Sequence, residues 1–274
     1  MMRLAIFART FRRPTLEQVL DAIAGSGIRD VQFNFSCAGM DTLPSKHESS
    51  LLDRITEAHR IRGLKMIAIS GTFNAIHPNL ELRNLLIQRC IKLIEACGYM
   101  KVPLVSLCTG TRCAEDMWTA HPDNTMPSVW MDLCRTLEPL IEAAEANDID
   151  LGIESERSNV INTAQRARQL LDEMQSPKLR IIMDGANLIE TCEQDSQQIT
   201  LQKAFELLGE AIVSVHAKSA SLEKPINQGS LDWQLYFALL HQLGYDGSVV
   251  LHNLFEKDVP ASKEFIEKST GIKG

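Results

Sequence analysis

Four side chains with metal-ligand chemistry follow one another along the second half of the chain at nearly regular intervals. They are Glu154, Asp184, His216 and His252, separated by 30, 32 and 36 residues, and each ends a short apolar run. Carboxylate oxygens and imidazole nitrogens together suit a divalent ion such as Mn²⁺, Zn²⁺, Co²⁺, Fe²⁺ or Mg²⁺. A single acid or histidine at such a place is more often a helix cap or a core residue. The regular spacing of all four therefore carries the prediction of a metal site.

The four apolar runs belong to a series of apparent strands that extends over the whole sequence. The predicted strands cover residues 3–8, 30–35, 65–70, 104–108, 150–154, 180–184, 212–216 and 248–252. Amphipathic stretches lie between them, and the clearest predicted helices cover residues 16–24, 80–96, 129–146, 164–174 and 233–243. Near-continuous apolar strands are typical of a parallel sheet that is buried on both faces.

Eight βα units in 274 residues predict an α/β fold, a (β/α)₈ TIM barrel that forms a single domain over residues 1–274. An open doubly wound sheet is the competing architecture, but no glycine-rich phosphate loop follows an early strand. In the barrel, the carboxyl ends of neighbouring strands meet at one mouth. Two connections at this mouth, residues 36–49 and 109–127, are long enough to be functional or to carry short helices.

The composition predicts an ordinary globular protein of the cytoplasm. The formal net charge is −7 and no Lys/Arg run occurs, which argues against nucleic acid and against an anionic membrane as partners. No apolar stretch approaches the ~20 residues of a membrane span, and the N-terminus is typical of a first strand, not of a signal peptide. The seven cysteines never form a CxxC pair, as expected in a reducing compartment.

The segments around the four candidate ligands carry a family resemblance. They read "LGIESE" (151–156), "IIMDGANL" (181–188), "VHAKS" (215–219), "GSLDW" (229–233) and "LGYDGSVVL" (243–251). In these motifs the chain resembles the xylose-isomerase-like TIM barrels, a superfamily of sugar phosphate isomerases and epimerases. The superfamily includes ketose 3-epimerases and inosose dehydratases and, more distantly, abasic-site endonucleases. The resemblance implies a metal-dependent isomerase or epimerase that acts through an enediolate on a small keto-sugar or polyol.

The resemblance is incomplete at the fourth candidate ligand. In ketose 3-epimerases of this superfamily, Glu, Asp, His and Glu hold the metal, and the two glutamates move the proton on opposite faces of the substrate. Glu154, Asp184 and His216 match the first three positions, whereas His252 stands where the second glutamate belongs. Imidazole binds the same ions, so a metal site is still expected. An epimerisation that uses two carboxylates is in doubt.

Other polar residues near the predicted mouth are candidates for catalysis and substrate binding. Glu154 is the expected base, with Glu156 or His252 as alternatives, and Lys218 would stabilise the enediolate. Asn187 would hydrogen-bond the substrate or cap the next helix. His77 follows the third strand, and Arg112 suits a substrate carboxylate or phosphate.

Three other functions are left open by the sequence. A metal-dependent dehydratase (lyase) of an inosose-like substrate would use the same intermediate. A phosphodiesterase like the abasic-site endonucleases would need further histidines, yet the fourth strand ends in Cys108. A non-catalytic sugar-binding barrel would have lost activity with the change of its fourth ligand. The expected partner is a small carbohydrate, and self-association of identical chains is left open.

Overall fold

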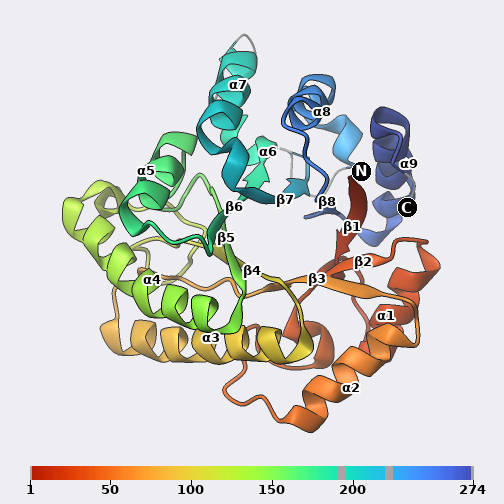
Figure 1. The fold of residues 1–274 in the computed structure, drawn as a ribbon, viewed down its shortest axis with the longest axis horizontal. Helices are drawn as coiled ribbons and strands as arrows, with labels where there is room; N and C mark the ends of the chain where they lie inside the picture. Colours follow the sequence, from red (N-terminus) through yellow and green to blue (C-terminus); the bar gives the residue numbers. More distant parts are fainter. Residues whose placement is uncertain (1, 190–195, 220–224, 273–274) are drawn as a thin grey trace.

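The computed structural model describes residues 2–189, 196–219 and 225–272. Eight parallel strands close into a barrel in sequence order, and the helices form a ring around it (Figure 1). The strands are β1 (Arg3–Phe7), β2 (Asp30–Phe33), β3 (Lys65–Ser70), β4 (Leu104–Cys108), β5 (Asp150–Glu154), β6 (Leu179–Asp184), β7 (Ile212–Ala217) and β8 (Ser248–Leu251). The predicted TIM barrel is confirmed.

The barrel closes where its first and last strands pair. Leu4 of β1 lies beside Val249 of β8, and Ile6 lies beside Leu251. Strands of a parallel barrel have side chains packed on both faces, which explains why the sequence of each strand is a nearly continuous apolar run. The closure also brings the two ends of the chain near each other (Figure 1).

Four of the longer described α-helices begin after a residue whose side chain caps them. Asn79 accepts a hydrogen bond from the backbone N–H of Leu82, and Thr163 accepts one from Arg166, as expected of N-caps. The helices are α1 (Leu16–Gly25), α2 (Ser49–Arg60), α3 (Leu80–Met100), α4 (Pro127–Asn147), α5 (Ala164–Met174), α6 (Gly185–Ile189), α7 (Gln197–Leu208), α8 (Trp233–Gln242) and α9 (Val259–Thr270). All five clear helices of the sequence are present, with ends displaced by a few residues.

The two long connections carry short 3₁₀ helices at the carboxyl ends of the strands. Their positions are η2 (Phe35–Ala38) and η3 (Pro122–Thr125). Gly110 opens the second connection with a φ of 76°, where an added Cβ would collide with Asn74. Asn74 in turn donates a hydrogen bond to the carbonyl of Thr111 at 2.8 Å. Loops β3–α3 and β4–α4 are therefore fixed against each other.

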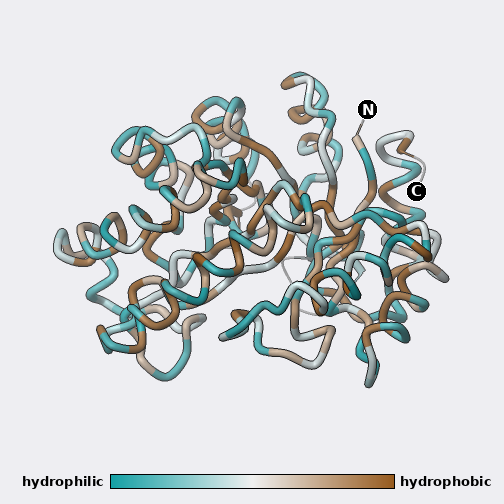
Figure 2. The backbone as a smooth tube through the Cα atoms, turned by 60° about the horizontal axis from the view of Figure 1, so that its bottom comes forward, coloured by the Kyte–Doolittle hydropathy of each residue, from teal (hydrophilic) through white to brown (hydrophobic). Residues whose placement is uncertain are grey.

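Hydropathy along the chain follows this arrangement. Hydrophobic and hydrophilic residues alternate along the outer helices, and the inner segments are mainly hydrophobic (Figure 2). In the described part of the chain, no helix has both the length and the apolar character that a membrane span needs.

Candidate active site

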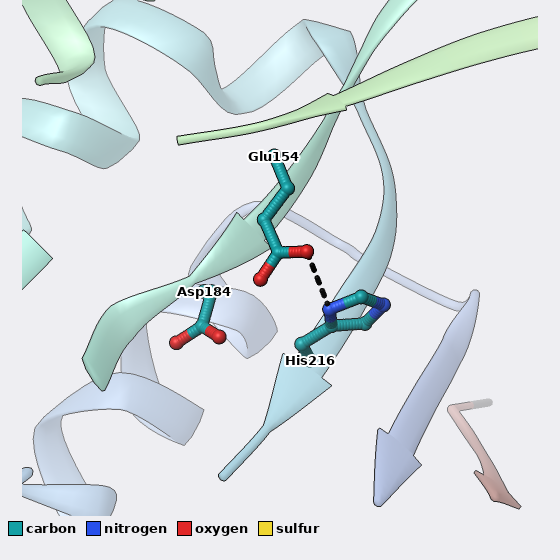
Figure 3. A group of neighbouring side chains, drawn as sticks. All are labelled: Glu154, Asp184 and His216. Atoms are coloured by element: carbon teal, nitrogen blue, oxygen red, sulfur yellow. Dashed lines mark ion pairs between the residues drawn. The ribbon is translucent and has the colours of Figure 1, made fainter. Parts of the chain in front are cut away.

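Three of the four candidate ligands come together at the carboxyl ends of adjacent strands. Glu154 ends β5, Asp184 ends β6, and His216 lies opposite Asp184 in the register of β7. One ligand atom from each residue lies within 4.8 Å of the others. Their side chains point toward a common centre (Figure 3). All three residues are buried, so their position is determined by the barrel.

The hydrogen bonding of His216 determines which of its nitrogens can bind a cation. Nε2 lies 2.9 Å from the amide oxygen of Gln32, and the amide nitrogen of Gln32 donates to Ser106. Because a carbonyl oxygen only accepts, His216 donates from Nε2 and Nδ1 keeps its lone pair. This Nδ1 lies 3.2 Å from Oε2 of Glu154. Two electron-pair donors at this distance need a cation or a proton between them.

The ligand atoms of the cluster fit a divalent cation. Nδ1 of His216 is buried and receives no hydrogen bond, and the buried Oδ2 of Asp184 has the ammonium of Lys218, at 3.2 Å, as its charged neighbour. A buried acceptor without a donor is costly, and Nδ1 here faces the carboxylates of Glu154 and Asp184. Two carboxylates and one neutral imidazole are a suitable donor set for Mn²⁺, Fe²⁺, Co²⁺ or Zn²⁺. The three residues would hold such an ion and leave further coordination positions for a substrate.

Lys218 lies among the carboxylates beside this cluster. Its Nζ is 3.2 Å from Oδ2 of Asp184, 3.2 Å from Oε1 of Glu156 and 4.0 Å from Oε1 of Glu154. Asn187 donates from Nδ2 to Glu156 at 3.0 Å and to Glu154 at 3.2 Å. The backbone N–H of Asn187 also donates to the Asp184 carboxylate at 3.1 Å, so Asp184 caps α6 and the side chain of Asn187, within that helix, joins the site.

Burial and neighbouring charges shift the pKa values of the three acids in different directions. Burial raises the pKa of Asp184 to about 7, and the charge of Glu154 acts in the same direction against the attraction of Lys218. Burial also raises the pKa of Glu156. For Glu154 the effect of burial is outweighed by the neighbouring His216 and Lys218, which lower its pKa. Among the three acids, Glu154 is therefore the one whose ionised form its surroundings favour.

His252 is placed differently from the other three candidate ligands. It follows β8 instead of ending it, and its ring stacks on that of His216 with centroids 4.3 Å apart and planes 10° apart. Phe7 stacks on the other face of His252 at 4.7 Å. Because the two rings are parallel and stacked, the His252 nitrogens do not point in the plane of the His216 ring toward Glu154 and Asp184. Metal ligation by His252 stays a prediction, and the orientation favours the catalytic role that the sequence also suggested.

A cavity of about 1040 Å³ opens above the cluster. Five predicted site residues line it, namely Glu154, Glu156, Asn187, Lys218 and His252. Asp184 and His216 lie buried beneath this surface, with side chains that are 0% and 1% exposed. A substrate in the cavity can thus contact the two glutamates, the lysine and His252, whereas Asp184 and His216 are placed to hold a metal.

The structure does not bring the predicted binding residues His77 and Arg112 to the cavity. Neither is among the described residues that line it. The Arg112 guanidinium pairs with Asp132 and donates to the carbonyl of Ile76 at 2.9 Å. His77 hydrogen-bonds the carbonyl of Ala114 at 3.1 Å. Both residues hold loops together at the mouth, and their role in substrate binding stays a prediction that these contacts do not favour.

The sequence did not single out several residues that belong to the site. Gln32 is 1% exposed and hydrogen-bonds His216. In the sequence, the only indication of its role is that it is a polar residue within an apolar strand. The sequence predicts Cys108, by contrast, to be a packed thiol; it lies 4.0 Å from Oε2 of Glu154, and burial raises its pKa well above the ordinary value. Arg9 and Arg12 also line the cavity.

Comparison with known proteins identifies the family. The family model described as the xylose isomerase-like TIM barrel matches residues 20–269. The chain belongs to this family. No curated protein matches it closely in sequence.

Solved structures similar to this xylose isomerase-like barrel include several sugar epimerases. The 3-keto-D-glucoside 4-epimerase of E. coli shares 18% identity over 98% of this chain and 100% of its own, with a TM-score of 0.77. A D-tagatose 3-epimerase-like protein shares 17% over 98% and 97%, with a TM-score of 0.78. The D-psicose 3-epimerase of Clostridium cellulolyticum H10, solved with D-tagatose, shares 16% over 98% and 99%, with a TM-score of 0.77. At these identities the likeness establishes a common fold over nearly the whole chain.

Proposed function

We propose that this xylose isomerase-like barrel is a divalent-metal-dependent isomerase or epimerase of a small keto-sugar or polyol. One observation carries the proposal. Buried ligand atoms of Glu154, Asp184 and His216 converge within 4.8 Å of one another, and Nδ1 of His216 receives no hydrogen bond, directly beneath a cavity lined by further acid–base groups. The fold shared with sugar epimerases supports the same class of substrate.

The residues around the cavity would have separate roles in a mechanism that proceeds through an enediolate. A bound divalent ion would lower the pKa of the C–H between adjacent carbonyl and hydroxyl oxygens of the substrate. The surroundings of Glu154 favour its ionised form and it reaches the cavity, so it would accept that proton. Lys218 would stabilise the negative charge of the enediolate. Asn187 holds Glu154 and Glu156 by hydrogen bonds and would fix their positions during proton transfer.

His252 is the candidate for the second proton transfer. Burial lowers its pKa well below the ordinary value, and the neighbouring His216 and Lys218 act in the same direction. A neutral imidazole at the cavity wall can both accept and return a proton. Return of the proton to a neighbouring carbon gives isomerisation, and return from the opposite face gives epimerisation.

Solvent deuterium incorporation tests the proposed chemistry. Purified protein would be supplied with Mn²⁺ or Co²⁺ and incubated in D₂O with a panel of ketoses, their phosphates and inososes. We expect deuterium at carbon next to the carbonyl for at least one class, and near-stoichiometric metal by elemental analysis. Glu154→Gln should abolish the exchange and leave the circular dichroism spectrum unchanged. The surface variant Glu57→Gln, on α2, is the matched control and should exchange normally.

The same experiment separates the alternatives. Loss of water from an inosose, with exchange at the adjacent carbon, would identify the dehydratase. Absence of bound metal after supplementation would reject the metalloenzyme and leave the sugar-binding barrel. The phosphodiesterase is disfavoured because, among the residues described, Glu154, Asp184 and His216 form the single cluster of possible metal ligands.

A further inference from the structure

Three arginines follow the first strand and line the wall of the cavity. Arg9, Arg12 and Arg13 fall within "RTFRR", residues 9–13, in a chain whose net charge is −7. Arg12 also lines a neighbouring hollow of about 360 Å³, together with Lys257. This side of the cavity rim is therefore cationic, although the molecule as a whole is acidic.

The loop that carries the arginines is held in place by other contacts. Phe11 is 3% exposed, and its N–H donates to the carbonyl of Ala8 at 3.1 Å. Arg13 makes two hydrogen bonds, of 2.8 and 2.6 Å, to the carboxylate of Glu256. These contacts fix the loop between β1 and α1 to the segment after β8. The backbone at Arg9 and Arg12 is thus preorganised.

Arg9 and Arg12 differ from Arg13 because neither has an ion-pair partner among the described residues. Neither guanidinium makes a hydrogen bond or an ion pair with any residue of the described ranges, 2–189, 196–219 and 225–272. Arg13 is paired with Glu256, and Lys218 is paired with three carboxylates. Arg9 and Arg12 are exposed and face the same space as the candidate metal centre.

The charges of the cavity are arranged in two zones. The carboxylates of Glu154, Glu156 and Asp184 lie at the floor, and the two free arginines lie on the wall formed by the β1–α1 loop. Arg9, Arg12, His252 and Glu154 all line this one cavity. The volume of about 1040 Å³ is at the upper end of the range for small-molecule sites. It accommodates a reacting group at the floor and a further group at the arginines.

We propose that Arg9 and Arg12 bind an anionic group, a phosphate or a carboxylate, at the end of the substrate remote from the metal centre. Guanidinium forms charge-assisted, bidentate hydrogen bonds with both of these groups. This proposal rests on the proposed function only in assigning the anion to a sugar. The substrate class is then a sugar phosphate or a sugar acid, with its keto end at Glu154 and its anion at the rim.

Binding of simple anions to the metal-free protein tests this site without any catalytic step. Inorganic phosphate and acetate would be titrated by calorimetry at low ionic strength into chelator-treated wild type, Arg9→Gln, Arg12→Gln and Arg60→Gln. Arg60 is exposed and paired with Glu57 on α2, so its variant is matched in charge and lies outside the described cavity lining. We expect each cavity variant to weaken anion binding by about tenfold, the value of one charged hydrogen-bonding partner. Arg60→Gln should bind as wild type does.

Each outcome has a defined meaning. Phosphate binding that depends on both arginines supports a phosphorylated substrate, and acetate binding with the same dependence supports a sugar acid. If neither anion binds, or if Arg60→Gln weakens binding as much as the cavity variants do, the proposal is overturned. In that case deuterium exchange with neutral ketoses would still support the isomerase. Conversely, arginine-dependent anion binding without exchange on any substrate would support the site and reject the isomerase.

Discussion

The amide oxygen of Gln32 lies 2.9 Å from Nε2 of His216, although the two residues are 184 positions apart in the sequence. This contact fixes the tautomer of the histidine and directs its free lone pair toward Glu154 and Asp184. The first quarter of the chain thus positions a ligand in the last quarter.

Replacement of Gln32 tests the importance of that contact. Gln32→Leu removes the acceptor, so His216 loses its fixed tautomer and orientation. We expect the affinity for Mn²⁺ to fall by about 10–100-fold, the usual effect of losing such an outer partner. Ser106→Ala removes only the other hydrogen bond of Gln32 and should have a smaller effect. Equal affinities in wild type and Gln32→Leu, by calorimetry, would contradict this role.

His252→Phe separates metal binding from proton transfer. The phenyl ring can keep the stack with Phe7 and His216 but has no nitrogen. We expect metal affinity to change by less than about 1 kcal/mol, and deuterium exchange to fall by about 10²–10⁴-fold. A collapse of metal binding would instead establish His252 as the fourth ligand. His252→Glu, which restores the residue found in ketose 3-epimerases, should increase metal affinity.

Lys218→Met should change metal affinity and turnover in opposite directions. The ammonium lies 3.2 Å from Asp184 and repels a divalent ion, so its removal should tighten Mn²⁺ binding. The same change removes the cation that would stabilise the enediolate, and exchange should fall by about 10²–10³-fold. Lys178→Met, at a lysine paired with Asp148 and Asp150, is the control and should alter neither quantity. Weaker metal binding in Lys218→Met would show that the lysine orients the ligands instead of opposing the ion.

Arg112→Met should affect stability and not substrate binding. The guanidinium is 15% exposed and joins Asp132 to the carbonyl of Ile76. Loss of these contacts should lower the free energy of unfolding by about 1–3 kcal/mol. Arg83 stays 3.2 Å from Asp132 and limits the effect. Urea denaturation measures the stability, and an unchanged KM is expected; a large rise in KM would support the substrate role that the sequence predicted.

The pH dependence of stability should carry a contribution from His59. This side chain is 2% exposed, and burial lowers its pKa to about 4, with the hydrogen bond to Ile55 opposing the shift and the charge of Arg62 adding to it. Between pH 6.5 and about 4, His59 is protonated in the unfolded chain but not in the folded protein. The free energy of unfolding therefore falls as the pH falls through this window. The loss should amount to about 1–3 kcal/mol. In His59→Leu, denaturation midpoints between these pH values should fall less steeply; an unchanged slope would exclude this contribution.

The sequence predicts the barrel well because each strand carries its own signal. Residues 65–70, 104–108 and 150–154 are strands with the predicted ends. Apolar strands of this length, separated by amphipathic helices, have few other ways to bury both of their faces. The convergence of Glu154, Asp184 and His216 follows directly, since parallel strands of a barrel end at the same mouth.

The remaining features of the site depend on contacts that no local pattern contains. Gln32 reads as an irregularity of one strand until β2 is placed across the barrel from β7. The parallel stacking of His252 depends on Phe7, which comes from the other end of the chain. Arg112 has the chemistry of an anion-binding residue, but its guanidinium is paired with the neighbouring Asp132. Arg9 and Arg12 have the same chemistry and no such neighbour among the described residues.

The rings of Phe7, His252 and His216 join β1, the end of β8 and β7 across the seam where the barrel closes. The orientation of His216, a candidate metal ligand, is therefore coupled to the pairing of the first and last strands, the strand pair with the greatest separation along the chain. Metal binding and closure of the barrel should stabilise each other, and a chain whose first strand has not yet docked would not have a complete site.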